Sequence, residues 1–237
     1  MAKKASAGAG LDYAERLAGT IYFIVYLLVM PLLAQRLFAL IGAVLGTSLN
    51  AGTQSHVYYW FLFAGTLFVF HRFAASSGTR LFGALDASGG SLLVGLLIFY
   101  GANELLYRVL SITLGSRVNL NDAPVAALLG SAPPMNTLAL VALLPFVEEM
   151  LFRGLVFGCI RERNRIAGYV ISAALYALAQ TWAFALSART LADFALLAQY
   201  LVPGLVFAWV YDRSGTLWTS ILLHAGVNAL ALWVILN

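Results

Sequence analysis

One stretch decides how this chain folds: PFVEEMLFRG, residues 145–154. It lies inside an apolar run from Asn136 to Ile160, which is long enough to cross the roughly 30 Å hydrocarbon core of a bilayer. A charged side chain near the centre of a spanning helix costs about 2.5–3.5 kcal/mol on insertion scales. Two glutamates and an arginine at this depth therefore indicate a functional site.

The spacing within the stretch separates the two glutamates. Glu149 and Arg153 are four residues apart, so they share one helix face and can neutralise each other. Glu148 lies about 100° further round the helix and has no basic residue at the favourable spacings. A buried carboxylate without a basic partner is typical of a general base. We therefore expect Glu148 to be the reactive group.

Composition indicates a membrane protein. Of 237 residues, 62% are hydrophobic and 10% are charged, whereas soluble domains carry about 25% charged residues. The sequence predicts an all-α fold, a polytopic transmembrane helix bundle. Pro31 predicts a kink in the first long apolar segment, and residues 71–90, with their Gly and Ser clusters, predict a connecting loop.

We expect seven spans, or eight if the first segment divides into a helix and a half-span. The predicted spans are Leu17–Gly46, Val57–Phe70, Ser91–Leu114, Asn136–Ile160, Ile166–Leu186, Phe194–Tyr211 and Thr216–Leu236.

The basic residues orient these spans. With a cytoplasmic N-terminus, the inside ends and loops hold Lys3, Lys4, Arg16, Arg72, Arg80, Arg161, Arg163, Arg165 and Arg213. The outside loops hold only Arg117 and Arg189, so the positive-inside rule favours this orientation. The net charge of +4 is explained in this way and needs no nucleic-acid partner. Arginine outnumbers lysine and alanine is abundant, which points to a bacterial cytoplasmic membrane.

Polar residues of three predicted spans lie at similar depth. At about 1.5 Å per residue, Glu148 is about 20 Å from Arg161 along its helix, and Gln180 is about 21 Å from Ile166. His224 and Asn228, four residues apart on one face of the last span, are about 13 and 20 Å from its start. We therefore expect these side chains to meet in the bundle interior.

The pairing of Glu148-Glu149-x-x-x-Arg153 with His224-x-x-x-Asn228 resembles the CPBP family. These are the CAAX-protease and bacteriocin-processing intramembrane proteases, also called the Abi family. The resemblance covers about residues 137–236. It divides the chain into a loose cytoplasmic N-terminus (1–16), N-terminal transmembrane helices of no recognised type (17–135) and a CPBP-like catalytic core (136–237). It implies that Glu148 activates a water and that His224 and Asn228 stabilise the oxyanion.

One position departs from the family pattern. The family's Phe-x-x-x-His motif aligns with Tyr176-Ala177-Leu178-Ala179-Gln180, so a glutamine stands where the family has histidine. An amide can orient a water molecule but cannot take its proton, and it is a poor metal ligand. With His224 as the one histidine in this half of the chain, a zinc site lacks its usual ligands. We expect a glutamate-type mechanism that requires no metal, although a divalent metal is not excluded.

The leading hypothesis is an intramembrane endopeptidase. Glu148 deprotonates a water, Gln180 holds it, and His224 with Asn228 stabilises the oxyanion, while Glu149, Arg153 and Tyr176 support the site. The substrate is a peptide or protein with an apolar or lipidated segment: a prenylated CAAX protein, a bacteriocin leader or a C-terminal sorting tail. The first alternative is a catalytically weak or inactive family member that acts as a scaffold or regulator. The second is a transporter, because intramembrane acids also mark ion paths.

Overall fold

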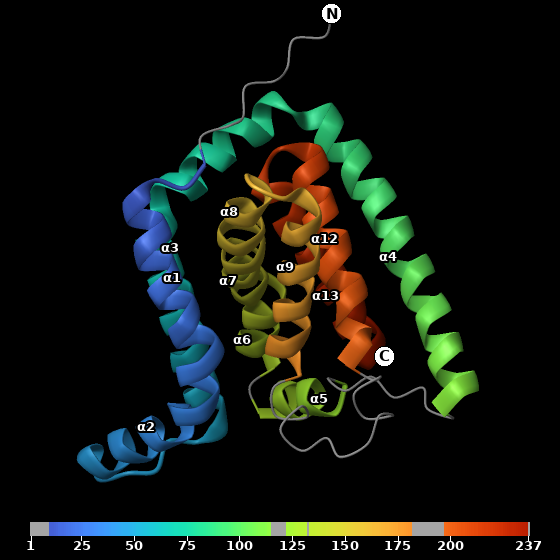
Figure 1. The fold of residues 1–237 in the computed structure, drawn as a ribbon. Helices are drawn as coiled ribbons and strands as arrows, with labels where there is room; N and C mark the ends of the chain where they lie inside the picture. Colours follow the sequence, from blue (N-terminus) through green and yellow to red (C-terminus); the bar gives the residue numbers. More distant parts are fainter. Residues whose placement is uncertain (1–9, 115–121, 132, 182–196, 237) are drawn as a thin grey trace, which may run out of the picture.

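The computed structural model describes residues 10–114, 122–131, 133–181 and 197–236, and within these ranges the chain is helical and contains no strand (Figure 1). The predicted all-α class is confirmed. Arg117, Arg189 and the predicted end of the fifth span near Leu186 lie outside the described residues.

The first apolar segment forms a long helical run with a change of direction. It consists of α1 (Tyr13–Ile24), the π-helical turn η1 (Val25–Val29) and α2 (Met30–Leu45). Pro31 is the second residue of α2, directly after the π turn, so its missing amide hydrogen falls where the helical run changes its hydrogen-bond pattern. α2 turns away from the bundle after α1 (Figure 1). The predicted bend near Pro31 is therefore present, and the wide π turn lies directly before it.

The predicted loop at residues 71–90 is wrong. α3 runs from Ala51 to Gly83 and α4 from Leu85 to Leu114, so helix continues through most of this segment. Tertiary contacts override the weak helix propensity of its Gly and Ser residues. Ser77 is fully buried, and its hydroxyl accepts a hydrogen bond from the Leu217 amide (2.8 Å). Phe70 is the one kinked residue within α3, where the helix bends over the bundle.

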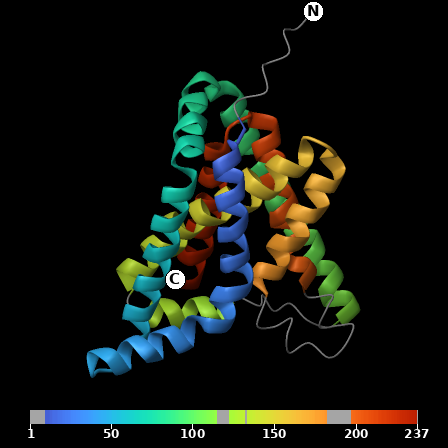
Figure 2. The same cartoon turned by 60° about the vertical axis from the view of Figure 1, so that its left-hand side comes forward.

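The second half of the chain builds the central helices. The predicted fourth span is one helical run of α6 (Pro133–Leu138), η2 (Ala139–Leu143), α7 (Leu144–Glu148), η3 (Glu149–Phe157) and α8 (Gly158–Arg161). It is followed by α9 (Arg165–Gln180), the 3-10 turn η4 (Leu197–Tyr200), α12 (Leu201–Ser214) and α13 (Leu217–Leu236). The short α5 (Asp122–Ser131) precedes the central run. Figure 2, turned from Figure 1, shows α1 and α3 standing beside this group of helices.

The core lies around η3, all of whose residues are buried. Small residues let the neighbouring helices approach closely. A Cβ on Gly204 of α12 would come within 2.8 Å of the Ala173 Cα of α9, and one on Gly95 of α4 would come within 2.5 Å of Val210 Cγ2. Close backbone approach at small residues is how helices gain packing energy in a lipid environment. This packing positions α4, α9 and α12 around the central run.

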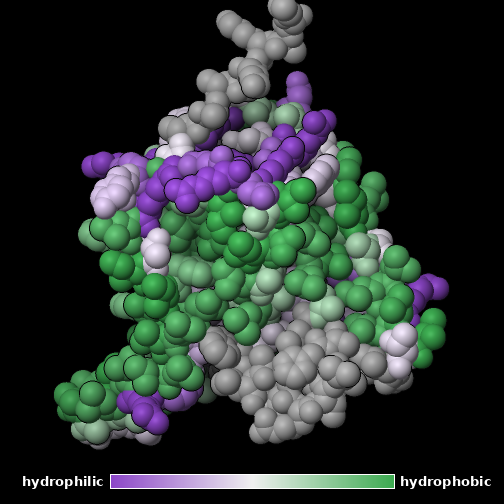
Figure 3. Space-filling view, in the orientation of Figure 1, coloured by the Kyte–Doolittle hydropathy of each residue, from purple (hydrophilic) through white to green (hydrophobic). Residues whose placement is uncertain are grey.

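Ion pairs gather at the end of the bundle where α1 begins. The pairs are Arg16–Glu162 (2.6 Å), Arg72–Asp12 (3.2 Å), Arg161–Asp212 (3.1 Å) and Arg165–Asp212 (2.6 Å). Figure 3 shows hydrophilic side chains at this end and a broad hydrophobic surface below them. Four of the arginines used to predict the orientation, Arg16, Arg72, Arg161 and Arg165, thus lie at one polar end.

In the part of the chain that the structure describes, three helical runs are long and apolar enough to cross a membrane: Tyr13–Leu45, Leu85–Thr113 and Leu217–Ile235. The count of seven or eight spans stays a prediction, and so does the cytoplasmic location of the polar end.

That location is testable with single cysteines in a Cys159→Ala background. Arg163 and Ser48 are both exposed, the first beside α8 at the polar end and the second in the turn between α2 and α3. We expect Arg163→Cys to react with a membrane-impermeant maleimide only after the membrane is opened, and Ser48→Cys to react in intact cells or spheroplasts. The reverse labelling pattern would invert the orientation.

Candidate active site

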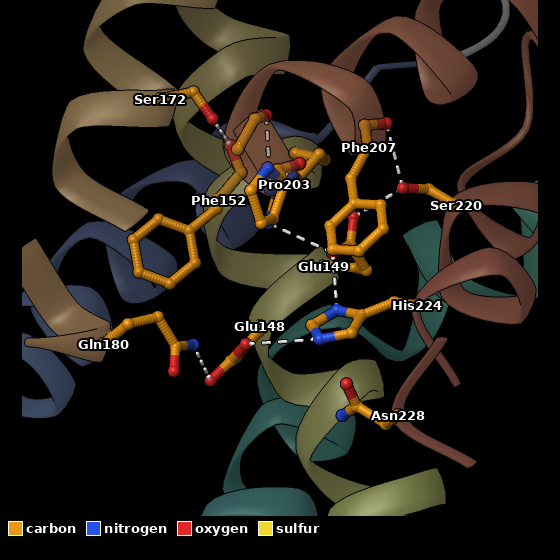
Figure 4. Close-up of polar contacts among 12 residues, drawn as sticks. Glu148, Glu149, Phe152, Ser172, Gln180, Pro203, Phe207, Ser220, His224 and Asn228 are labelled. Carbon is orange, nitrogen blue, oxygen red and sulfur yellow. Dashed lines mark hydrogen bonds and ion pairs between the residues drawn. The ribbon is translucent and has the colours of Figure 1, made fainter. Parts of the chain in front are cut away.

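Glu148 is the last residue of α7, and its carboxylate is 2% exposed. Its two oxygens have different surroundings (Figure 4). Oε1 accepts a hydrogen bond from Gln180 Nε2 (2.8 Å) and one from the Tyr26 hydroxyl (3.3 Å). Oε2 has no hydrogen-bond partner among the described residues and faces His224 Nε2 at 3.8 Å. One oxygen is held in place, and the other is buried without a hydrogen bond.

Glu149 has a different environment from its neighbour. Arg153 Nη1 lies 3.0 Å from Oε1, and His224 Nδ1 lies 2.9 Å from the same oxygen. The Ser220 hydroxyl donates to Oε2 (2.6 Å). The carboxylate and the guanidinium are both fully buried, so the ion pair predicted from the spacing of Glu149 and Arg153 is confirmed.

The Arg153 guanidinium is also bound by groups outside its own helix. Nη2 donates to the carbonyls of Gly204 (3.2 Å) and Pro203 (3.4 Å) in α12. Its Cζ lies 4.3 Å from the ring centre of Tyr176 and 5.2 Å from that of Phe207. Aromatic faces stabilise a desolvated cation. Tyr176 therefore contacts the supporting ion pair rather than the Glu148 carboxylate.

The imidazole of His224 is held on two sides. Its ring stacks on Phe207, with centroids 4.5 Å apart and an interplanar angle of 20°. Because the ion-paired Glu149 carboxylate is an acceptor, Nδ1 is assigned as the donor in their contact. Nε2 then points toward Glu148 Oε2. Glu149 thus fixes the orientation of the ring.

Asn228 hydrogen-bonds the backbone of η2. It is half-buried, and its Nδ2 donates to the carbonyl of Leu140 (2.8 Å). The structure thus brings Glu148, Gln180 and His224 into one cluster and places Asn228 at its edge, beside η2 (Figure 4).

π-helical turns surround this cluster. η2 supplies the Leu140 carbonyl that binds Asn228, and η3 begins at Glu149. In π-helices the backbone bonds run from i to i+5, and such turns are frequently found at functional sites. Side chains from other helices reach the backbone here: Ser172 of α9 donates to the Phe152 carbonyl (2.8 Å). The sequence did not predict these π turns, because an apolar run has the same pattern of residues whether it forms an α-helix or a π-helix.

Two residues that donate hydrogen bonds to the glutamates, Ser220 and Tyr26, were not predicted from the sequence. Ser220 lies four residues before His224, so the same helix-face argument that linked His224 to Asn228 could have found it. Tyr26 lies in the first apolar segment, and no spacing relates it to Glu148.

Among the described residues, no group of three or more His, Cys, Asp and Glu side chains is placed to hold a metal ion. Glu148, Glu149 and His224 do come close together. However, Glu149 already neutralises Arg153 and binds both Ser220 and the Nδ1 of His224. The donor set does not fit a metal centre of the usual kind.

Comparison with known proteins finds relatives of the part of the chain that contains this site. The family model described as "Type II CAAX prenyl endopeptidase Rce1-like" matches residues 130–230. The "UPF0177 protein YxdF" of Lactococcus lactis subsp. lactis (strain IL1403) is 30% identical over 142 residues, which cover 57% of this chain and 71% of the relative. No solved structure matches the chain.

The buried ion pair leads to a stability prediction. Arg153→Met leaves the Glu149 carboxylate buried without its cation, and we expect this to cost about 3–5 kcal/mol. Arg153→Met combined with Glu149→Gln removes both charges, so the double variant should unfold at a higher temperature than Arg153→Met alone. The measurement is the thermal unfolding midpoint in detergent.

The control is the exposed pair Arg72–Asp12 at the polar end of the bundle. Arg72→Met should lower the thermal midpoint much less than Arg153→Met, because water can solvate the remaining Asp12 carboxylate. Equal losses for Arg153→Met and Arg72→Met, or a double variant as unstable as the sum of its single variants, would contradict this account of the ion pair.

Proposed function

This chain belongs to the CPBP family of CAAX-type membrane proteases, and on that premise we propose that it is an intramembrane endopeptidase whose base is Glu148. The observation that carries the proposal is the asymmetry of the Glu148 carboxylate. Two donors hold Oε1, whereas Oε2 faces His224 at 3.8 Å without a hydrogen bond. A general base needs a lone pair aimed at the water that it deprotonates.

In the proposed reaction a water binds between Glu148 Oε2 and the scissile carbonyl carbon. Oε2 takes a proton as the water oxygen attacks, and the carbonyl oxygen becomes an oxyanion. The same carboxyl group then gives the proton to the leaving amine as the carbon–nitrogen bond breaks. Gln180 holds Oε1 throughout, so the carboxylate keeps its orientation in both steps. The role expected for Gln180 changes from binding the water to orienting the base.

Geometry supports an electrostatic role for His224. Its Nδ1 donates to Glu149, and its Nε2 lies 3.8 Å from Glu148 Oε2. Nε2 is therefore close to the position where the reacting carbonyl would develop negative charge, and we assign it as a donor to the oxyanion.

Asn228 completes the proposed oxyanion site. Its amide nitrogen carries two hydrogens, and one of them binds the Leu140 carbonyl. We assign the second hydrogen to the oxyanion. Since the side chain is anchored to the backbone of η2, it is already oriented before substrate binds.

The substrate class follows from the position of the site. A carboxylate this deeply buried among apolar helices is reached by a substrate that can itself enter the bilayer. We propose a membrane-associated peptide or protein with an apolar or lipidated segment, such as a prenylated CAAX protein, in keeping with the family description "CAAX prenyl endopeptidase". The polar end of the bundle would face the cytoplasm.

The first test removes the base. Glu148→Gln keeps the shape of the side chain but loses its basicity, so we expect turnover to fall by at least about 10³-fold with folding intact. The assay uses purified protein in lipid and a reporter peptide with a farnesylated cysteine near its C-terminus, and mass spectrometry identifies the products. Thermal unfolding of the same samples checks the fold.

The control for this variant is Glu104→Gln, which removes an exposed carboxylate on α4 and should leave turnover unchanged. Full activity in Glu148→Gln would remove this residue from the mechanism. Wild-type cleavage lost to a chelator and restored by zinc would contradict a metal-free reaction.

Gln180 distinguishes an active protease from an inactive family member. If it orients the base, Gln180→Ala should lower kcat by about tenfold, since one hydrogen bond to a charged group is lost. Gln180→His should retain activity, because an imidazole N–H can donate to the same oxygen. A scaffold protein would instead be inert both as wild type and as Gln180→Ala, and would gain hydrolysis only with Gln180→His.

A further inference from the structure

We infer that Tyr26, in the N-terminal half of the chain, is a positioning residue for the Glu148 carboxylate. This inference rests on the proposed function of Glu148. Tyr26 lies in the π turn η1 and contacts the site across 122 positions of sequence. It also lies outside residues 130–230, the part of the chain that matches the family model.

The first observation is where the hydroxyl binds. It donates to Glu148 Oε1 at 3.3 Å, the same oxygen that accepts from Gln180 Nε2 at 2.8 Å. The two donors come from different elements, η1 and α9. Together they oppose rotation of the carboxylate about its terminal bond, which otherwise has a broad energy minimum. Oε2 is thereby kept facing His224.

The second observation distinguishes the role of the Tyr26 hydroxyl from the packing role of its ring. Phe23, three residues earlier, packs edge-on against Phe152 with centroids 5.4 Å apart, and Tyr26 packs on the same ring at 6.0 Å. Packing on Phe152 is therefore possible without a hydroxyl. A buried hydroxyl is costly unless it is hydrogen-bonded, so its presence beside a carboxylate requires a reason beyond packing. Donation to Glu148 supplies that reason.

Several charged or ionisable groups face Glu148, and each of them affects the pH at which its carboxylate takes up a proton. Charged or ionisable neighbours come from every adjacent element: Tyr26 from η1, Tyr58 and Tyr59 from α3, Glu149 and Arg153 from η3, Tyr176 from α9 and His224 from α13. Removing the Tyr26 hydroxyl changes one of these and leaves the others in place. A donor to the ionised carboxylate favours the charged form, so its loss should make Glu148 keep its proton to higher pH.

The experiment compares Tyr26→Phe with Tyr22→Phe. Tyr22 is on α1, one turn earlier, and its half-buried hydroxyl donates to the Leu62 carbonyl (2.7 Å) instead of to the site. For Tyr26→Phe we expect kcat to fall about tenfold with KM within about twofold, and the acid limb of the kcat/KM profile to move up by about one pH unit. Tyr22→Phe should change neither quantity, whatever it does to the thermal midpoint.

A second measurement is independent of cleavage. Dicyclohexylcarbodiimide, an apolar reagent, modifies buried carboxyl groups in their protonated form. Peptide mapping gives the labelled fraction of Glu148 against pH, and Glu148→Gln identifies the signal. We expect the pH of half-maximal labelling to be about one unit higher in Tyr26→Phe than in wild type and in Tyr22→Phe.

The two measurements separate this inference from the proposed function. If the labelling curve of Tyr26→Phe is shifted but the wild type cleaves no reporter peptide, the positioning role of Tyr26 is supported and the proposed endopeptidase activity is overturned. Cleavage by wild type with identical labelling curves and identical kcat in Tyr26→Phe would overturn the inference and leave the endopeptidase standing. If Tyr26→Phe loses activity only in step with a lower thermal midpoint, and its labelling curve is not shifted, the inference about Tyr26 is also overturned.

Discussion

The fully buried ion pair between Glu149 and Arg153 is the constraint on which the rest of the structure depends. Separating the two charges inside the bundle would leave each without a partner, at a cost of several kcal/mol. Each partner also holds other helices. Arg153 binds the Gly204 carbonyl of α12 and the face of Tyr176 of α9, and Glu149 binds Ser220 and His224 of α13. One local pair therefore fixes three helices around η3.

Two adjacent glutamates receive different environments from this arrangement. Glu149 is neutralised and surrounded by donors, so it acts as scaffold and orients His224. Glu148, on the next face of the helix, is bound at one oxygen only. Active sites give two neighbouring acids different roles by placing them in different environments. The proposed base depends on its neighbour, because the ring that faces its Oε2 is held by Glu149.

The helical irregularities are concentrated at this site. Among the described residues the π turns are η1, η2 and η3, and they carry Tyr26, the Leu140 carbonyl and the ion pair, respectively. A π turn changes the direction in which the following side chains point, so it re-aims polar groups without ending the helix. The N-terminal segment that carries Tyr26 lies outside the residues that the family model matches, and it contributes a direct contact to the site.

The sequence by itself determined the all-α class, the candidate membrane helices and the Glu149–Arg153 pair, because these follow from composition and from spacing within one helix. It also placed Gln180 and His224 near Glu148 from depth alone. Only the tertiary structure decided that residues 71–83 are helical, that Asn228 binds Leu140 and that Tyr26 reaches Glu148. The physical reason is that local periodicity fixes which side chains share a face. Packing between helices, shifted here by π turns, decides which faces meet.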